Sequence, residues 1–279
     1  MDLTNLRNLC WRITKKCNRK CEFCLASSHK GYELTSYDIG KVVNRLVELK
    51  VNKIIYAGGE PLIHPQLPSI VSAMSNTDIT QVLTTNGDKL RRHIPDWIDI
   101  IDGVRVSFYG NKTTHDRIMG NGHFEMLSKL VKDLSQRVTC SVNLMLHKGN
   151  VDNIEELLYT FSSLGANRIL LLSYVRTGLE SIDSKYEISQ ENKETINEIK
   201  HANYLPNGAL FVDFDKIDNY LVMDERLNLT RTLKGKKDTI EVGNIFDDSV
   251  YIDNSNIFLH DYLDSIWVNP LRVEGVRAL

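Results

Sequence analysis

The chain has 279 residues, of which 42% are hydrophobic and 25% charged, as in ordinary globular proteins. Its 34 lysines and arginines nearly balance 36 acidic residues, so the net charge of -2 excludes a global attraction to nucleic acid or to an anionic membrane. No run approaches the ~18 apolar residues of a membrane-spanning helix, and the N-terminus lacks the segments of a secretory signal. We therefore expect a cytoplasmic protein with reduced cysteines.

Short β-branched runs alternate with helical patterns in the first part of the chain. Three segments have the apolar spacing typical of helices: 36–50, 124–136 and 151–165. The first begins with Ser36 as its predicted N-cap, and the last ends at Gly165. The candidate strands are residues 9–13, 53–57, 81–85, 103–108, 139–146 and 168–175. Such repeated strand–helix units indicate parallel crossovers, so the sequence predicts an α/β fold with a partial (β/α)6 TIM-type barrel.

The pattern changes near residue 205. "ALFVDFD", "NYLVMDERLNLT" and "TIEVGN" predict short strands, with a hairpin turn at Asp224–Glu225, and residues 256–268 predict a closing helix. We therefore expect two parts: a barrel domain over residues 1–204 and a small C-terminal α+β extension over residues 205–279, packed on the barrel.

Three of the five cysteines, Cys17, Cys21 and Cys24, are spaced C-x3-C-x2-C. Thiolates bind soft metals. Structural zinc takes four protein ligands, and His29 would complete such a set. A [4Fe–4S] cube normally takes one cysteine per iron, so three cysteines leave one iron open for a ligand. The spacing favours the cluster over zinc, and both readings stay open at this point.

Two further motifs follow at the ends of predicted strands. In "AGGEPL", the paired glycines Gly58 and Gly59 would let a ligand approach the backbone closely. In "LTTNG", Thr85 and Asn86 bring polar groups to the side of a barrel where ligands bind. An ordinary turn is the alternative explanation for each motif.

The order "CNRKCEFC", "GGEP" and "TTNG" resembles the radical S-adenosylmethionine (SAM) superfamily, in particular the branch of molybdopterin-precursor cyclases and SPASM-type maturases, from Leu9 to Thr177. The resemblance implies that Cys17, Cys21 and Cys24 ligate a [4Fe–4S] cluster. It also implies that SAM binds the open iron through its amino and carboxylate groups. One-electron cleavage of SAM then gives a 5′-deoxyadenosyl radical that abstracts hydrogen from a substrate.

Two sets of candidate site residues follow from this resemblance and from positions at strand ends. The substrate candidates are His115 and Arg117, in a loop that resembles the family's HD-x-x-x-G stretch, and Tyr174 and Arg176, at the end of the sixth predicted strand. For the loop, side chains that simply face water are the alternative. The expected cofactor contacts are Gly58, Gly59, Glu60, Thr85, Asn86, Ser107 and Asn143.

The chain also departs from these relatives. Their auxiliary clusters are held by C-terminal cysteines, whereas the last cysteine here is Cys140. The stretch from 242 to 267 still resembles a SPASM scaffold without its metal ligands. Both Cys140 and Cys10 lie in predicted strands, where we expect them to be buried as small hydrophobic residues.

The sequence therefore predicts a radical SAM enzyme acting on a small polar metabolite, sugar- or nucleotide-like, with residues 205–279 covering the site. One alternative is a maturase that epimerises or crosslinks a ribosomally made peptide. Another is a non-catalytic zinc or iron–sulfur module. The expected partners are a small-molecule or peptide substrate and a flavodoxin- or ferredoxin-type electron donor, without nucleic acid or membrane.

Overall fold

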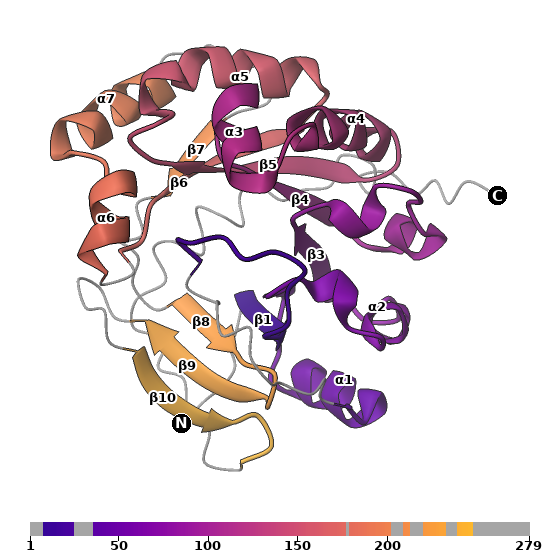
Figure 1. Ribbon diagram of the computed structural model, residues 1–279. Coiled ribbons are helices and arrows are strands. Elements are labelled where there is room, and N and C mark those ends of the chain that lie inside the picture. Colours follow the sequence, from indigo (N-terminus) through magenta and orange to yellow (C-terminus); the bar gives the residue numbers. More distant parts are fainter. Residues whose placement is uncertain are drawn as a thin grey trace.

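A computed structural model gives the architecture of the chain (Figure 1). The residues that the structure describes are 8–24, 36–176, 179–201, 209–212, 220–232 and 239–247. The predicted closing helix and most of the SPASM-like tail lie outside these residues.

One curved sheet of ten strands organises the described part of the chain, in the order β10-β9-β8-β1-β2-β3-β4-β5-β6-β7. Six of the parallel strands coincide with the six that the sequence predicts. The parallel strands from β1 to β7 are β1 (Asn8–Thr14), β2 (Lys53–Gly58), β3 (Thr80–Thr85), β4 (Gly103–Phe108), β5 (Thr139–Leu146), β6 (Arg168–Ser173) and β7 (Ala209–Val212).

Helices cover the outer face of this curved sheet (Figure 1). They are α1 (Ile39–Glu48), α2 (Leu67–Met74), α3 (Lys112–Met119), α4 (His123–Ser135), α5 (Ile154–Ser163), α6 (Glu180–Tyr186) and α7 (Gln190–His201). Short 3-10 turns lie between them: η1 (Pro61–Ile63), η2 (Asp88–Leu90), η3 (Asp96–Ile100) and η4 (Val151–Asn153).

The first helix shows how sequence sets an element and where the prediction missed. Asp38, and not Ser36, is its N-cap, because the Asp38 side chain accepts a hydrogen bond from the backbone N–H of Lys41 at 3.2 Å. The buried stripe of α1 is Val42, Val43 and Leu46.

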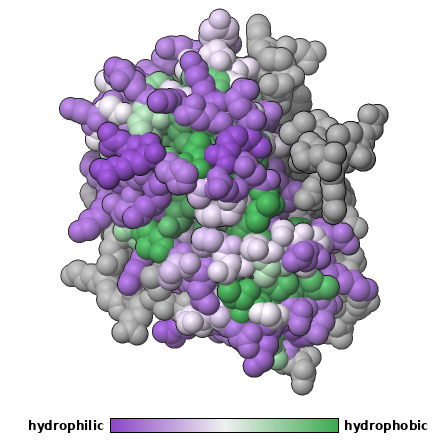
Figure 2. Space-filling view, turned by 90° about the vertical axis from the view of Figure 1, so that its right-hand side faces the viewer, coloured by the Kyte–Doolittle hydropathy of each residue, from purple (hydrophilic) through white to green (hydrophobic). Residues whose placement is uncertain are grey.

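The core lies between the outer face of the sheet and the helices. Alternate strand residues such as Trp11, Tyr56 and Val106 pack there. Phe161 of α5 belongs to the same core, and all four side chains are 0% exposed. Cys10 and Cys140 are buried in β1 and β5, as predicted. The outer surface in Figure 2 is mostly hydrophilic, with hydrophobic side chains in separate small patches, which is ordinary for helices that face water.

The strands after residue 205 join both edges of the barrel sheet. Strand β7 pairs with β6, while β8 (Tyr220–Met223) pairs in parallel with β1 at the other edge. Strands β9 (Asn228–Thr232) and β10 (Thr239–Asn244) continue from β8 in antiparallel order. The predicted turn at Asp224 is confirmed, with its carboxylate accepting from the Asn228 backbone at 2.9 Å. The domain boundary at residues 204 and 205 stays a prediction.

Candidate functional site

The three-cysteine loop follows β1 directly, at the edge where the carboxyl ends of the parallel strands meet. Cys17, Cys21 and Cys24 are free and partly exposed. The backbone N–H of Cys24 donates to the carbonyl of Cys21 at 3.1 Å, which makes a turn at the end of the loop. Cys17 Sγ accepts from the backbone N–H of Arg19 at 3.3 Å. The loop thus presents three sulfur donors at the ligand-binding edge of the barrel.

The electrostatics of the loop test whether these thiols fit a metal centre. Burial, together with the neighbouring thiolates of Cys24 and Cys17, raises the pKa of Cys21 to about 11. Burial is also the main cause that raises the pKa of Cys17. The thiols therefore lie close enough to repel one another once ionised. Iron–sulfur ligation relieves such repulsion, so the donor set fits a cluster held by thiolates.

No three His, Cys, Asp or Glu side chains in the described ranges are arranged around one point as ligands of a single metal ion. Zinc requires such convergence, with Zn–S distances of about 2.3 Å. In a cube, each thiolate ligates a different iron, so the sulfurs stand further apart. His29, the predicted fourth zinc ligand, lies outside the described residues. The geometry therefore carries no argument for a single ion.

The two glycines of "GGEP" meet the end of β1 and the cysteine loop, and their expected role in letting a ligand approach the backbone stays a prediction. A Cβ at Gly59 would lie 2.0 Å from the carbonyl oxygen of Lys16, and one at Gly58 would lie 2.3 Å from that of Thr14. Instead, the Gly59 N–H donates to the Thr14 carbonyl at 2.7 Å, and the N–H of Glu60 donates to the Lys16 carbonyl at 2.8 Å. The missing side chains let β2 and the loop bond backbone to backbone.

Glu60 ties this junction to the end of β3. The side chain is 1% exposed, and its two oxygens accept from the Thr85 hydroxyl at 2.8 Å and from the Asn86 N–H at 2.9 Å. A third hydrogen bond comes from the Leu62 N–H at 3.2 Å. Burial raises the pKa of Glu60 to about 7, against the opposing effect of these hydrogen bonds. The carboxylate therefore organises the backbone of two predicted motifs.

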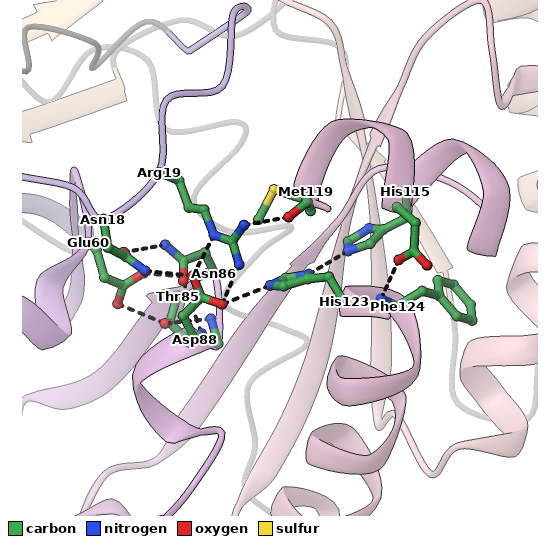
Figure 3. A network of polar contacts seen from close by, with 12 residues as sticks. Asn18, Arg19, Glu60, Thr85, Asn86, Asp88, His115, Met119, His123 and Phe124 are labelled. Atoms are coloured by element: carbon green, nitrogen blue, oxygen red, sulfur yellow. Dashed lines mark hydrogen bonds and ion pairs between the residues drawn. The ribbon is translucent and has the colours of Figure 1, made fainter. Parts of the chain in front are cut away.

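Asn86 continues the connection back to the loop (Figure 3). Its amide nitrogen donates to the Asn18 side-chain oxygen at 2.9 Å and lies 3.9 Å from Cys17 Sγ. Asn18 in turn donates to Asp88 at 2.6 Å. The structure thus brings Gly58, Gly59, Glu60, Thr85 and Asn86 together around the three-cysteine loop.

Two other predicted cofactor contacts, Ser107 and Asn143, lie side by side on the inner face of the sheet, because they are register partners on β4 and β5. The side-chain oxygen of Asn143 is buried and has no hydrogen-bond partner within the described part of the chain. A buried amide oxygen without a donor is costly. The pair therefore fits a ligand that supplies a hydrogen-bond donor at this position.

The four predicted substrate residues do not come together. Tyr174 donates to the Asp183 carboxylate at 2.7 Å, and Arg176 forms ion pairs with acidic residues of α6 and its end. His115 is fully buried, with both ring nitrogens engaged. A direct substrate contact by any of these three stays a prediction without geometric support.

Arg117 is placed differently. It is exposed and lines a cavity of about 310 Å³ beside the cysteine loop. The remaining lining residues are Glu22, Thr114, Ile118, His147, Gly149, Lys185 and Tyr186.

Three residues of the site were missed by the sequence reasoning: Arg19, Asp88 and His123. Arg19 binds both oxygens of Asp88 through Nε and Nη2, each at 2.5 Å, and His123 Nε2 lies 3.2 Å from the same carboxylate. The sequence did carry a signal for two of them, because Asp88 directly follows "TTNG" and Arg19 lies between two of the three cysteines.

A parallel partial barrel with three cysteines at the carboxyl ends of its strands has the arrangement of enzymes that bind a ligand or cofactor at this edge. Residues 11–161 match the model of the family described as the Radical SAM superfamily, and the chain therefore belongs to this superfamily. Its cofactors are accordingly a [4Fe–4S] cluster and SAM, and its members need a reductant. The predicted recognition, enzyme class and cofactors are confirmed at this level.

Curated relatives share part of the chain. A protein named probable GTP 3′,8-cyclase from Methanococcus maripaludis is 35% identical over 130 residues, which are 44% of this chain and 44% of that protein. Mycofactocin maturase MftC from Mycolicibacterium smegmatis is 24% identical over 195 residues, which are 67% of this chain and 50% of that protein. The chain thus spans about half the length of the curated relatives it matches.

Solved structures confirm the predicted fold class. Streptococcus suis SuiB bound to S-adenosylmethionine aligns with a TM-score of 0.68 at 14% identity, covering 93% of this chain and 68% of that one. Native anSMEcpe with bound AdoMet and Cp18Cys peptide aligns with a TM-score of 0.67 at 14% identity, covering 87% and 79%. Among the described helices, none has the length and hydrophobicity needed to cross a bilayer.

Proposed function

We propose that Cys17, Cys21 and Cys24 hold the [4Fe–4S] cluster of this radical SAM enzyme and that SAM binds at the adjoining strand ends. The observation that carries the proposal is the backbone attachment of the cysteine loop to β2 at Gly59 and Glu60. When bound, the cluster and SAM supply an electron and a 5′-deoxyadenosyl radical that removes hydrogen from a substrate.

The chain's own residues hold and shape this site. Glu60 fixes the ends of β2 and β3 through its hydrogen bonds to Thr85 and Asn86. Ser107 and Asn143 supply a hydroxyl and an amide on the inner face of the sheet for the polar groups of SAM. In this arrangement Gly58 and Gly59 act through backbone placement.

The proposed substrate is a small polar metabolite of nucleotide or sugar type. The 35% identity to a protein named probable GTP 3′,8-cyclase supports this class. Arg117 in the neighbouring cavity supplies a cation for a polar substrate. A peptide substrate is the second candidate, supported by the alignment with a mycofactocin maturase over 67% of this chain. The reductant is a flavodoxin- or ferredoxin-type protein.

The test is reconstitution with iron and sulfide without oxygen, followed by dithionite and SAM. The wild-type chain is expected to release 5′-deoxyadenosine, and Cys17→Ala is expected to release none. Wild-type protein that carries the cluster but forms no 5′-deoxyadenosine would contradict the proposal. GTP that protects residues 205–279 from proteolysis would support the metabolite over the peptide.

A further inference from the structure

A buried chain of hydrogen bonds leads from the β4–α3 loop to the carboxylate of Asp88 (Figure 3). The Tyr109 backbone N–H donates to His115 Nδ1 at 3.1 Å, so this nitrogen is an acceptor and the proton is on Nε2. His115 Nε2 then donates to His123 Nδ1 at 2.8 Å. His123 Nε2 donates to Asp88 at 3.2 Å. A single backbone donor thus fixes the tautomers of both imidazoles.

Both rings are neutral in this arrangement. Burial is the main cause that lowers the pKa of His115 to about 3, and burial also lowers the pKa of His123. The two ring planes are nearly parallel, 17° apart, and the rings meet edge to edge through the hydrogen bond between them, with their centroids 5.1 Å apart. Neutral rings that are hydrogen-bonded on both sides give Asp88 a donor that does not rotate away.

Asp88 uses its acceptor positions fully. Besides His123, it accepts from Asn18 at 2.6 Å and from the Nε and Nη2 groups of Arg19 at 2.5 Å each. The paired bonds from Arg19 form the bidentate geometry that holds a guanidinium most firmly. Arg19 Nη1 also donates to the Met119 carbonyl at the end of α3. The charge of Arg19 is therefore fixed on three sides.

This fixed charge lies within the cysteine loop. Arg19 lies between Cys17 and Cys21 in the sequence, and its backbone N–H donates to Cys17 Sγ. Met119 contacts both Arg19 and Cys21: its carbonyl accepts a hydrogen bond from Arg19, and its Sδ lies 3.8 Å from Cys21 Sγ. The side chain of Arg19 is 28% exposed, so water screens its charge only in part.

A cysteine-ligated cluster gains negative charge on reduction, and nearby charge shifts its potential. We infer that Arg19 raises the reduction potential of the three-cysteine centre and that Asp88 with the His123–His115 pair positions it. Arg19 supplies the charge, and the other three residues act through it. The inference rests on the proposed function, because it takes Cys17, Cys21 and Cys24 as the cluster ligands.

The test is a redox titration, followed by electron paramagnetic resonance, of reconstituted wild type, Arg19→Gln, Arg19→Lys and Lys20→Gln. Arg19→Gln is expected to keep its iron and sulfide and to lower the one-electron reduction constant roughly tenfold, about 59 mV in midpoint. Arg19→Lys keeps the charge without the bidentate bonds, so its midpoint potential is expected to lie between those of wild type and Arg19→Gln. Lys20→Gln removes an exposed charge from the same loop and is expected to shift the midpoint far less.

Equal midpoints for wild type and Arg19→Gln at equal iron content would overturn the inference, as would equal shifts for Arg19→Gln and Lys20→Gln. Wild-type protein that assembles no cluster would instead refute the proposed function.

The positioning chain has its own test in the protein without metal. Nitrogen-15 NMR of labelled histidine should show two neutral rings, each with its proton on Nε2. A proton on Nδ1 of either ring, or a charged ring at pH 7, would overturn the proposed hydrogen-bond chain from Tyr109 to Asp88. The effect on potential is tested with His123→Leu, expected to lower the midpoint partly, and His123→Gln, expected to restore it through an amide donor to Asp88. Two unshifted midpoints would overturn the positioning role.

Discussion

Gly59 is the position where one added carbon should separate the cysteine loop from the sheet. In Gly59→Ala, the new Cβ would lie 2.0 Å from the Lys16 carbonyl oxygen and 2.8 Å from that of Lys15. Real Cβ contacts never approach this closely, and the obstructing atoms are backbone, so no side chain can turn away. The loop must therefore move, and the hydrogen bonds at 2.7 Å and 2.8 Å that join it to β2 must lengthen.

The magnitude follows from these contacts. Each lost hydrogen bond costs about 1 kcal/mol, and forcing an atom into a packed site costs about 1–3 kcal/mol. We expect Gly59→Ala, which loses two such hydrogen bonds, to lower the free energy of unfolding by roughly 3–5 kcal/mol. Gly40 in α1 is the matched control, because its added Cβ meets only the Asp38 side chain at 3.8 Å. Gly40→Ala should raise stability by about 0.5–1 kcal/mol, since alanine favours the helix.

The assay is urea unfolding of the metal-free, reduced protein, followed by circular dichroism. Iron per chain after reconstitution is measured in parallel and should fall in Gly59→Ala alone. Coincident unfolding midpoints for the two variants, together with full iron in both, would show that the loop leaves β2 without cost and would refute the reasoning.

Three further predictions concern the ligands and the buried carboxylate. Cys21→Ala should abolish cluster binding, whereas Cys140→Ala should keep it, because Cys140 is buried in β5; equal iron losses in the two variants would refute the ligand assignment. Glu60→Gln should weaken SAM binding without loss of iron, since one amide hydrogen would face the Asn86 N–H; unchanged affinity in calorimetry would speak against this. The raised pKa of Glu60 favours folding while the group is protonated, and this advantage is lost as pH rises from about 4.5 to about 7. The stability of wild type relative to Glu60→Gln should fall on the order of 3 kcal/mol across this window in urea titrations, and a flat difference would contradict the pKa shift.

The strands of the barrel could be predicted because each carries a local signal. Runs such as "KIIYA" and "GVRVSF" are β-branched and are separated by helical spacing, so the parallel order follows from βαβ connection rules. The cysteine loop was equally local. The pairing at the two edges of the sheet could not be predicted. The sequences of β7 and β8 indicate strands but not which free edge of the sheet each strand joins.

The polar network of the site depends on contacts between distant parts of the chain. Arg19 and Asp88 are 69 positions apart, and His123 reaches the same carboxylate from another helix. No periodicity signals such a pairing. The glycines of "GGEP" were identified as positions of close approach, and the approaching atoms belong to the end of β1 and the loop after it, which only the fold brings there.

In the proposed function, three thiolates of this chain hold an iron–sulfur cube. The most direct measurement is the iron, sulfide and zinc content of the protein purified without oxygen, together with its absorption spectrum. We expect a brown protein with about four iron and four sulfide per chain. A colourless protein with one tightly bound zinc and no sulfide would contradict it.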